Sequence, residues 1–335
     1  GGGGGYLVAT KLLGPRVGVV SGCALIVDYV LTITVSVATG CDAVFSFLPE
    51  AWLPWKLTVE VFVLVFLIVL NLRGVRESVT FLLPIFLVSA LGAVFGEQYW
   101  KQSANPRNGR KLRLFYGLLT AGLALLVVSR NAVCFLVGWE FMALSCFFAM
   151  TAEDDKEEVR EAGWIYFAST HLSTLILFAF FALYFLAKGS LALEPFPPGG
   201  ISPGMANALF VLALAGFGRK AGLYPLHFWL PPAHASAPSH VSALMSGVLI
   251  KMGVYGMLRT LWLFPEVPLW WATCLLALGC LSGVLGVAFA IGQHDLKRLL
   301  AYHSIENIGI IFMGLGLAAA GRALDRADWV ALGLG

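Results

Sequence analysis

Long apolar runs recur along this chain and restrict the folds open to it. Stretches of about 18 or more mostly apolar residues follow one another with short polar connections between them. Backbone polar groups in hydrocarbon need internal partners, so such runs predict membrane-spanning α-helices. Hydrophobic residues make up 59% of the 335 and charged residues 12%, against about 25% charged in soluble domains. The predicted fold class is an all-α polytopic membrane protein with about ten transmembrane helices.

The expected spans follow from the apolar runs and the polar residues that bound them. They cover residues 17–40, 57–72, 79–96, 112–129, 131–150, 163–187, 205–226, 241–264, 269–291 and 299–320. A further helix is expected to begin near Trp329. The stretch 193–204 is rich in proline and glycine, which predicts an irregular surface loop.

Composition argues against several functional classes. A net charge of +3 is too small to indicate nucleic-acid binding. The six cysteines form no CxxC pair and mostly fall within apolar runs, where we interpret them as small hydrophobic residues. His234 and His240 flank a short loop, but no third ligand is spaced to complete a metal site with them. We therefore expect no cofactor, no metal and no redox centre in this chain.

Three ionisable residues lie deep inside apolar runs. Glu140 stands about ten residues into its span, Lys220 lies in FGRKAGLYP, and Lys251 lies in SGVLIKMGVYG. An ionisable side chain at bilayer depth costs several kcal/mol, so each is a functional hypothesis. The glycines and Pro225 around Lys220 predict a discontinuous helix, a feature that is tolerated in membranes where it lines a cavity.

These residues suggest a path for protons. Burial disfavours the charged form of a lysine and a nearby carboxylate restores it, so movement of Glu140 relative to Lys220 would change whether Lys220 holds a proton. Lys251 would be one step further, bridged by His227 or His240 and water. The alternative for each lysine is a structural ion pair, and for His227 it is core packing.

A second candidate step lies near the end of the chain. His303 and Glu306 stand three residues apart, which puts them on one face of a helix. They could pass protons onward, or they could simply form a local hydrogen bond.

Residues from about 91 to the end resemble the proton-translocating antiporter-like membrane subunits. The resemblance rests on GWE at 138–140, the segment 216–259 and DLKRLLAYHSIENIGII at 295–311. That family includes membrane subunits of respiratory complex I, formate hydrogenlyase, group 4 hydrogenases and cation/proton antiporters. The motif HSIENIGII at 303–311 is most similar to the hydrogenase branch. By resemblance, Glu140 and Lys220 match the family's Glu–Lys pair and Lys251 matches a relay residue.

The resemblance also implies partners and location. We expect other membrane and redox subunits of a complex I-like or hydrogenase-like assembly, a bacterial or archaeal plasma membrane, and protons or sodium ions as the transported species. This chain would be a non-redox subunit of an oxidoreductase complex. The family has two inverted repeats. Here the first, over 112–264, looks intact, and the second is expected to be truncated at the C-terminus.

Residues 1–88 resemble a different family. The glycine run before Tyr6, VDYVLT at 27–32 and NLRG at 71–74 are similar to part of an amino-acid/polyamine/organocation permease. We therefore expect two domains, a permease-like fragment of two or three helices at 1–90 and an antiporter-like domain at 91–335. The join would lie in 84–96.

Basic residues orient the spans, because they concentrate on the cytoplasmic side. From residue 97 onward, inside loops would hold Lys101, Arg107, Arg110, Lys111, Arg113, Lys156, Arg160, Lys297 and Arg298. Outside loops would hold Arg130, Lys188, Arg259, Arg322 and Arg326. The first ninety residues give an orientation that differs by one crossing, which fits a rearranged chain.

Three functions remain open from the sequence. The first is a proton-translocating subunit coupled to electron transfer in partner subunits. The second is an amino-acid permease fragment, and the third is a truncated or chimeric scaffold that does not transport.

Overall fold

The computed structural model describes residues 58, 61, 77–100 and 108–335, with the backbone alone for 77–82. The expected span 17–40, nearly all of 57–72 and the permease-like motifs lie outside these residues, so the two-domain division stays a prediction. Within the described ranges every regular element is a helix, and strand pairing is limited to a single bridge between Asn131 and Ala192.

The helices follow the apolar runs closely. They are α4 (Glu77–Tyr99), α5 (Gly109–Val128), α6 (Ala132–Met150), α7 (Glu157–Lys188), α8 (Pro203–Ala221), α9 (Leu230–Ser236), α10 (Ser239–Leu244), the π-helix η2 (Met245–Leu249), α11 (Lys251–Leu263), α12 (Leu269–Ile291), α13 (Leu296–Ala323) and α14 (Ala327–Leu334). Six stretches are long and apolar enough to cross a bilayer, with α10, η2 and α11 together forming one of them. The all-α membrane fold is confirmed, and the chain is an integral membrane protein.

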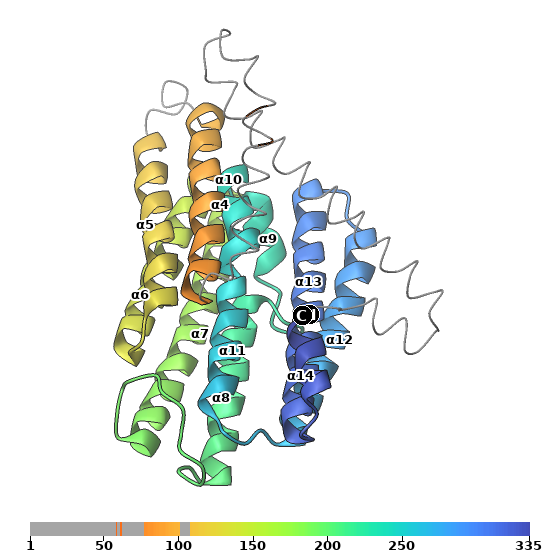
Figure 1. Ribbon diagram of the computed structural model, residues 1–335. Coiled ribbons are helices and arrows are strands. Elements are labelled where there is room, and N and C mark those ends of the chain that lie inside the picture. Colours follow the sequence, from red (N-terminus) through yellow and green to blue (C-terminus); the bar gives the residue numbers. More distant parts are fainter. Residues whose placement is uncertain (1–57, 59–60, 62–76, 101–107) are drawn as a thin grey trace.

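The long helices lie side by side, with most of them roughly parallel or antiparallel (Figure 1). α5 packs on α6, α7 on α8, and α8 on α11, whereas α12, α13 and α14 form the edge at the blue end of the chain. α11 approaches α8 at Gly253, where a Cβ would fall 2.5 Å from the carbonyl oxygen of Phe217. Such close backbone approach at small residues is typical of helices packed in membranes.

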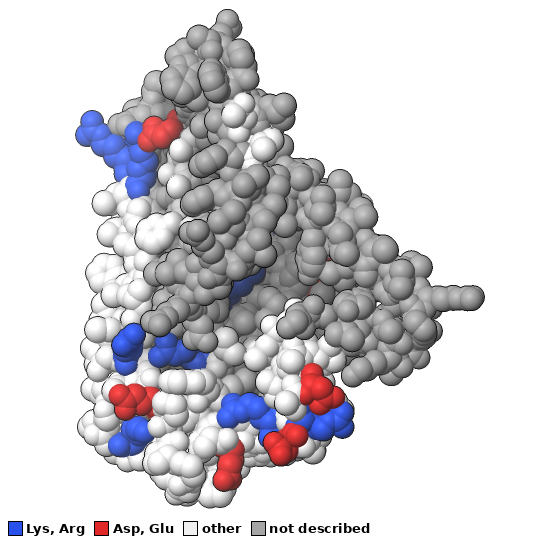
Figure 2. Space-filling view, viewed as in Figure 1, with Lys and Arg blue, Asp and Glu red and all other residues white. Residues whose placement is uncertain are grey.

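The loops expected on the inside meet at one end of the bundle. Arg113 at the start of α5 pairs with Glu97 at the end of α4, with 2.8 Å between Nη1 and Oε1. Lys297 at the start of α13 donates to the carbonyl oxygen of Ala237 at 2.8 Å. On the face drawn in Figure 2, most charged side chains gather toward the ends of the molecule. Which end of the bundle faces the cytoplasm stays a prediction.

The opposite end is held together by side chains that reach loop carbonyls. Lys188 donates to the carbonyl oxygen of Pro195 at 2.6 Å, which anchors the irregular loop over 193–204 to the end of α7. Arg322 of α13 donates to the carbonyl oxygen of Leu261 at 2.7 Å and also to that of Phe264. Two of the basic residues expected outside, Lys188 and Arg322, thus bind carbonyl oxygens at helix ends and loops.

Candidate functional site

The centre of the bundle contains a helix that stops short. α8 ends at Ala221 because Gly222 adopts the left-handed conformation, with φ at +76°. The amide of Leu223 then donates to the carbonyl oxygen of Gly218 at 2.9 Å, and the chain turns until α9 begins at Leu230. The discontinuous helix predicted around Lys220 is confirmed. The helix in the expected span 205–226 therefore ends before the apolar run does, because the break falls at Gly222.

Lys220 is the penultimate residue of α8 and is enclosed by aromatic rings. Its exposed fraction is 1%. Its Nζ lies 4.9 Å from the ring centre of Tyr166 and 5.9 Å from those of Trp139 and Trp229. Nζ also donates to the Tyr166 hydroxyl oxygen at 3.1 Å, and this hydroxyl donates to the carbonyl oxygen of Ala143. Ring faces attract a cation, so this enclosure can hold an ammonium group away from water.

Glu140 lies at the middle of α6, within electrostatic range of Lys220 and Tyr166. Its ionisable neighbour on α7 is His171, with 3.8 Å between Oε2 and Nε2. Its other oxygen, Oε1, is buried and has no hydrogen-bond partner among the described residues. Glu140 and Lys220 thus lie within electrostatic range of each other. Within the described ranges, however, they form no ion pair at 4.0 Å or less.

Lys251 begins α11, and one residue, Ile250, separates it from the end of the π-helix η2. The wider turn is visible in the backbone, where the amide of Ile250 donates to the carbonyl oxygen of Met245, five residues back, at 3.2 Å. Lys251 Nζ donates to the carbonyl oxygen of Ser246 at 2.6 Å. The hydroxyl of Ser246 in turn contacts that of Ser304 on α13 at 2.7 Å. A distortion at mid-helix therefore gives this lysine a backbone partner, and the same serine links the segment to α13.

The histidines proposed as bridges lie in aromatic surroundings. His227 stacks on Tyr224 with ring centres 5.2 Å apart, and its Nδ1 is buried without a partner in the described residues. His240 is buried against Tyr116 of α5 and Tyr99 of α4, at 5.3 and 6.3 Å between ring centres. The printed contacts of His240 are thus with α4 and α5, and none joins it to Lys220 or Lys251.

His234 is the histidine within electrostatic range of Lys251 and Lys297. It is 2% exposed, and its Nδ1 lies 2.7 Å from the hydroxyl oxygen of Ser242. In the sequence His234 stood out only as a loop residue beside His240. Its place beside the lysines depends on how α9 folds back against the bundle, which no local pattern indicated.

His303 and Glu306 form the predicted pair on one helix face. Nδ1 of His303 lies 2.7 Å from Oε2 of Glu306. Their side chains are 46% and 25% exposed on α13, so this pair lies at the surface of the described bundle. Both alternatives, proton relay and local hydrogen bond, fit this geometry.

Sequence reasoning missed two polar residues of the site, Tyr166 and His171 on α7. Both lie in the run GWIYFASTHLST, inside the span expected over 163–187. His171 was available as a signal, because it is ionisable and lies well inside an apolar helix. Tyr166 gave no comparable signal, since a tyrosine in an apolar run is ordinary.

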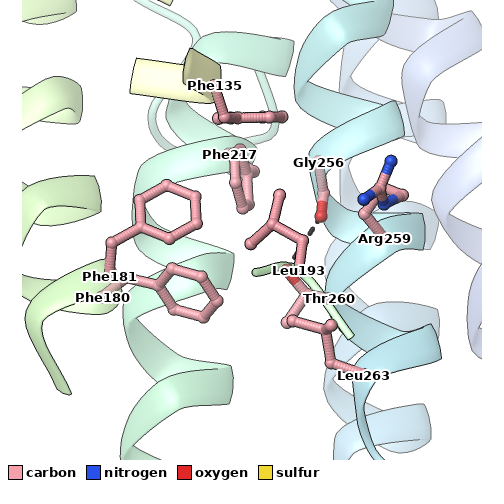
Figure 3. A pocket seen from close by; sticks show the side chains of 9 residues that line it. All are labelled: Phe135, Phe180, Phe181, Leu193, Phe217, Gly256, Arg259, Thr260 and Leu263. Atoms are coloured by element: carbon pink, nitrogen blue, oxygen red, sulfur yellow. Dashed lines mark hydrogen bonds between the residues drawn. The ribbon is translucent and has the colours of Figure 1, made fainter. Parts of the chain in front are cut away.

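The described residues line a hollow of about 760 Å³ at the end of the bundle, beside Trp100, Ala237 and Lys297, and a much smaller one in its interior. The smaller hollow, of about 10 Å³ and enough for about one water, lies among Phe135, Phe217 and other apolar side chains (Figure 3). Its polar neighbours are Thr260, bonded to the carbonyl oxygen of Gly256 at 2.8 Å, and Arg259. In the described residues no group of three or more His, Cys, Asp or Glu side chains could hold a metal ion.

Comparisons with known proteins agree with this architecture. Residues 129–325 match the family model described as NADH:quinone oxidoreductase/Mrp antiporter, TM. Hydrogenase-4 component B of Escherichia coli is 38% identical over 79% of this chain and 40% of its own length. Formate hydrogenlyase subunit 3 of the same organism is 36% identical over 70% of this chain and 37% of its own length. The chain thus spans less than half the length of these curated relatives.

A solved structure supports the same grouping. The membrane-bound sulfane sulfur reductase, an archaeal respiratory membrane complex, contains a chain that superimposes with a TM-score of 0.62 at 26% identity. The match covers 76% of this chain and 55% of that one. The chain belongs to the family of NADH:quinone oxidoreductase and Mrp antiporter transmembrane subunits.

Proposed function

We propose that this chain is a proton-translocating membrane subunit of a respiratory or hydrogenase complex. The observation that carries the proposal is the enclosure of Lys220, which is 1% exposed at the broken end of a helix in mid-bundle. Transporters use such breaks as binding sites, and an intramembrane lysine without a function would be costly to keep. A lysine side chain changes its charge by gaining or losing one proton, so we take the transported species to be a proton.

The proposed path begins at Glu140 and Lys220 and continues to Lys251. Lys220 would take a proton from the Glu140 side and hold it as an ammonium against the Tyr166 oxygen and the surrounding rings. It would return to the neutral amine when the proton moves toward Lys251. His234, within range of Lys251, is a better placed intermediate than His240. Each charge moved across 100 mV exchanges roughly 2.3 kcal/mol, so modest changes in these interactions are enough to drive the transfer.

The energy source and the partners follow from the relatives. The relatives are named as a hydrogenase-4 component, a formate hydrogenlyase subunit and a chain of an archaeal respiratory membrane complex. We propose that this chain likewise assembles with other membrane and redox subunits and that their electron transfer drives the proton path. His303 and Glu306 are both partly exposed on α13 and would then pass protons toward a neighbouring repeat or subunit.

Proton flux into proteoliposomes tests the proposal directly. The full chain is reconstituted around a trapped pH-sensitive dye, and flux is driven by a potassium diffusion potential. Lys220→Ala and Glu140→Gln are expected to reduce the flux to the level of empty vesicles. The matched control is Lys156→Ala, which removes a lysine from an exposed loop and should leave the flux unchanged. Equal flux in wild type and in both path variants would contradict the proposal.

A further inference from the structure

His171 faces Glu140 from the neighbouring helix and is absent from the path described above. It lies inside α7, and its Nε2 is 3.8 Å from Oε2 of Glu140 on α6. The side chains of His171 and Glu140 are 37% and 27% exposed, so both reach the lateral surface of the described bundle. Glu140 also lies within electrostatic range of Tyr166 and of the enclosed Lys220. Glu140 therefore has both a surface histidine and an interior lysine in its neighbourhood.

The hydrogen bonds of His171 identify which ring nitrogen carries the fixed proton. Nδ1 lies 3.0 Å from the backbone carbonyl oxygen of Phe167, one turn earlier in α7. A carbonyl oxygen has no hydrogen to give, so Nδ1 must be the donor. The ring is further held by Phe167, whose centre lies 3.9 Å from its own. In the neutral ring Nε2 consequently carries a lone pair, and this lone pair faces the carboxyl group.

Counting protons shows what this arrangement requires. If both groups lacked a proton, a lone pair would face a carboxylate, and the contact would be repulsive. One proton makes the contact attractive whether it resides on Nε2, giving imidazolium and carboxylate, or on Oε2, giving a neutral acid and a neutral ring. A separation of 3.8 Å exceeds a hydrogen bond, so transfer between the two needs closure by about 1 Å or one bridging water.

The other titratable groups near the pair come from all three helices around it. Cys146 on α6 lies beside Tyr166, Tyr166 itself is on α7, and Lys220 is on α8. Arg219 of α8 is engaged with Ser169, whose hydroxyl and carbonyl oxygens accept from its Nε at 3.0 and 3.2 Å. Of these groups, the lysine is the one that would accept a proton from Glu140 in the proposed path.

We infer that His171 is a proton-sharing partner of Glu140, so that the two side chains together hold one proton at the lateral entrance to Lys220. This inference rests on the proposed function for its direction of flow. The pairing itself rests on the geometry of α6 and α7. In the first step the N–H bond at Nε2 breaks and an O–H bond forms at Oε2. In the second step that O–H bond breaks and an N–H bond forms at the Lys220 amine.

Nitrogen NMR of the full chain, labelled with ¹⁵N-histidine and held in lipid bilayers, tests the pairing without any flux. His171→Gln assigns the His171 signals by their disappearance. Glu140→Gln is expected to move the His171 Nε2 resonance toward that of a nitrogen with a free lone pair, because the population carrying the shared proton falls about tenfold for each 1.4 kcal/mol of lost attraction. The His171 Nδ1 resonance should keep the position of a protonated nitrogen in both samples.

The same chain supplies a matched control. Glu306→Gln removes the carboxylate beside His303, so it should shift the His303 signals and leave those of His171 in place. An unchanged His171 Nε2 resonance in Glu140→Gln, or an unprotonated Nδ1 in wild type, would overturn the inference. A flux measurement on His171→Gln separates the two claims. Reduced flux supports a role in the path, whereas normal flux together with the NMR shift would leave the pairing intact and remove His171 from the path.

Discussion

Lys220 and Lys251 are both lysines within apolar helices, yet the fold holds them differently. Lys220 is sealed by three aromatic rings and has a side-chain hydroxyl as its partner. Lys251 is half-buried and donates to a backbone carbonyl beside a π-helical turn. The difference shows two ways to keep a cation in a membrane. One surrounds the charge with polarizable ring faces, and the other offers it a carbonyl made available by an irregular backbone.

Replacing each lysine by arginine should separate the two environments most strongly. An arginine stays charged at all relevant pH values and its planar group is larger, so Lys220→Arg should abolish proton flux and also disturb the ring enclosure. Lys251→Arg should lose flux too but fold normally, because its surroundings are more open. The measurements are vesicle proton flux and the thermal unfolding midpoint. Equal midpoints for both variants would contradict the contrast in enclosure.

Removing one hydroxyl from each environment should have unequal effects. Tyr166→Phe leaves the ring in place but removes the oxygen that accepts from Lys220. A hydrogen bond to a charged group is worth about 1.5–3 kcal/mol, so flux should fall by about 10- to 100-fold.

Ser246→Ala is the matched change at the other lysine. Lys251 binds the carbonyl oxygen of Ser246 and not its hydroxyl, so flux should stay within about twofold of wild type. A large loss in Ser246→Ala together with a normal Tyr166→Phe would reverse the comparison.

The contact between α8 and α11 connects the two lysine environments and should be sensitive to bulk. Gly253→Leu would force a side chain against the carbonyl oxygen of Phe217 and the amide of Ala221. Overpacking of this kind costs typically about 1–3 kcal/mol, so the unfolding midpoint should drop. Gly117→Leu is the control, since a Cβ there meets nothing within 4 Å. Similar midpoints for the two variants would contradict the close approach of these helices.

The smallest effect is expected where a lysine is fully accessible to water. Lys156 pairs with Glu153 at 2.7 Å in the loop before α7, and the hydrogen bond that Lys156 donates to this carboxylate raises the pKa of Lys156. Its contribution to stability is present below the ordinary lysine pKa and is lost as pH rises through the raised value. Exposed pairs are worth less than about 1 kcal/mol, so Glu153→Gln should leave the unfolding midpoint at neutral pH nearly unchanged. A drop as large as that of Gly253→Leu would show that this loop is not an ordinary solvated surface.

Much of the fold could be predicted because apolar runs of sufficient length have few alternatives in a membrane. The ends of α6 and α12 fall within a residue or so of the expected spans 131–150 and 269–291. The break after Lys220 was also visible, since Gly222 and Pro225 follow it within five residues. The partners of the site residues were not, because they depend on which faces of neighbouring helices meet. Glu140 faces His171 of α7, and the helix period alone could not assign that contact.

The central claim, that Lys220 gains and loses a proton, is tested most directly by ¹⁵N NMR of lysine side chains in the full chain in lipid bilayers. Lys220→Arg assigns the Lys220 signal by its disappearance. We expect wild type to contain both the ammonium and the neutral amine of Lys220 across neutral and mildly alkaline pH, with exchange between them that slows in Glu140→Gln. A Lys220 that remains a single ammonium species throughout, with the same signal in Glu140→Gln, would contradict the account.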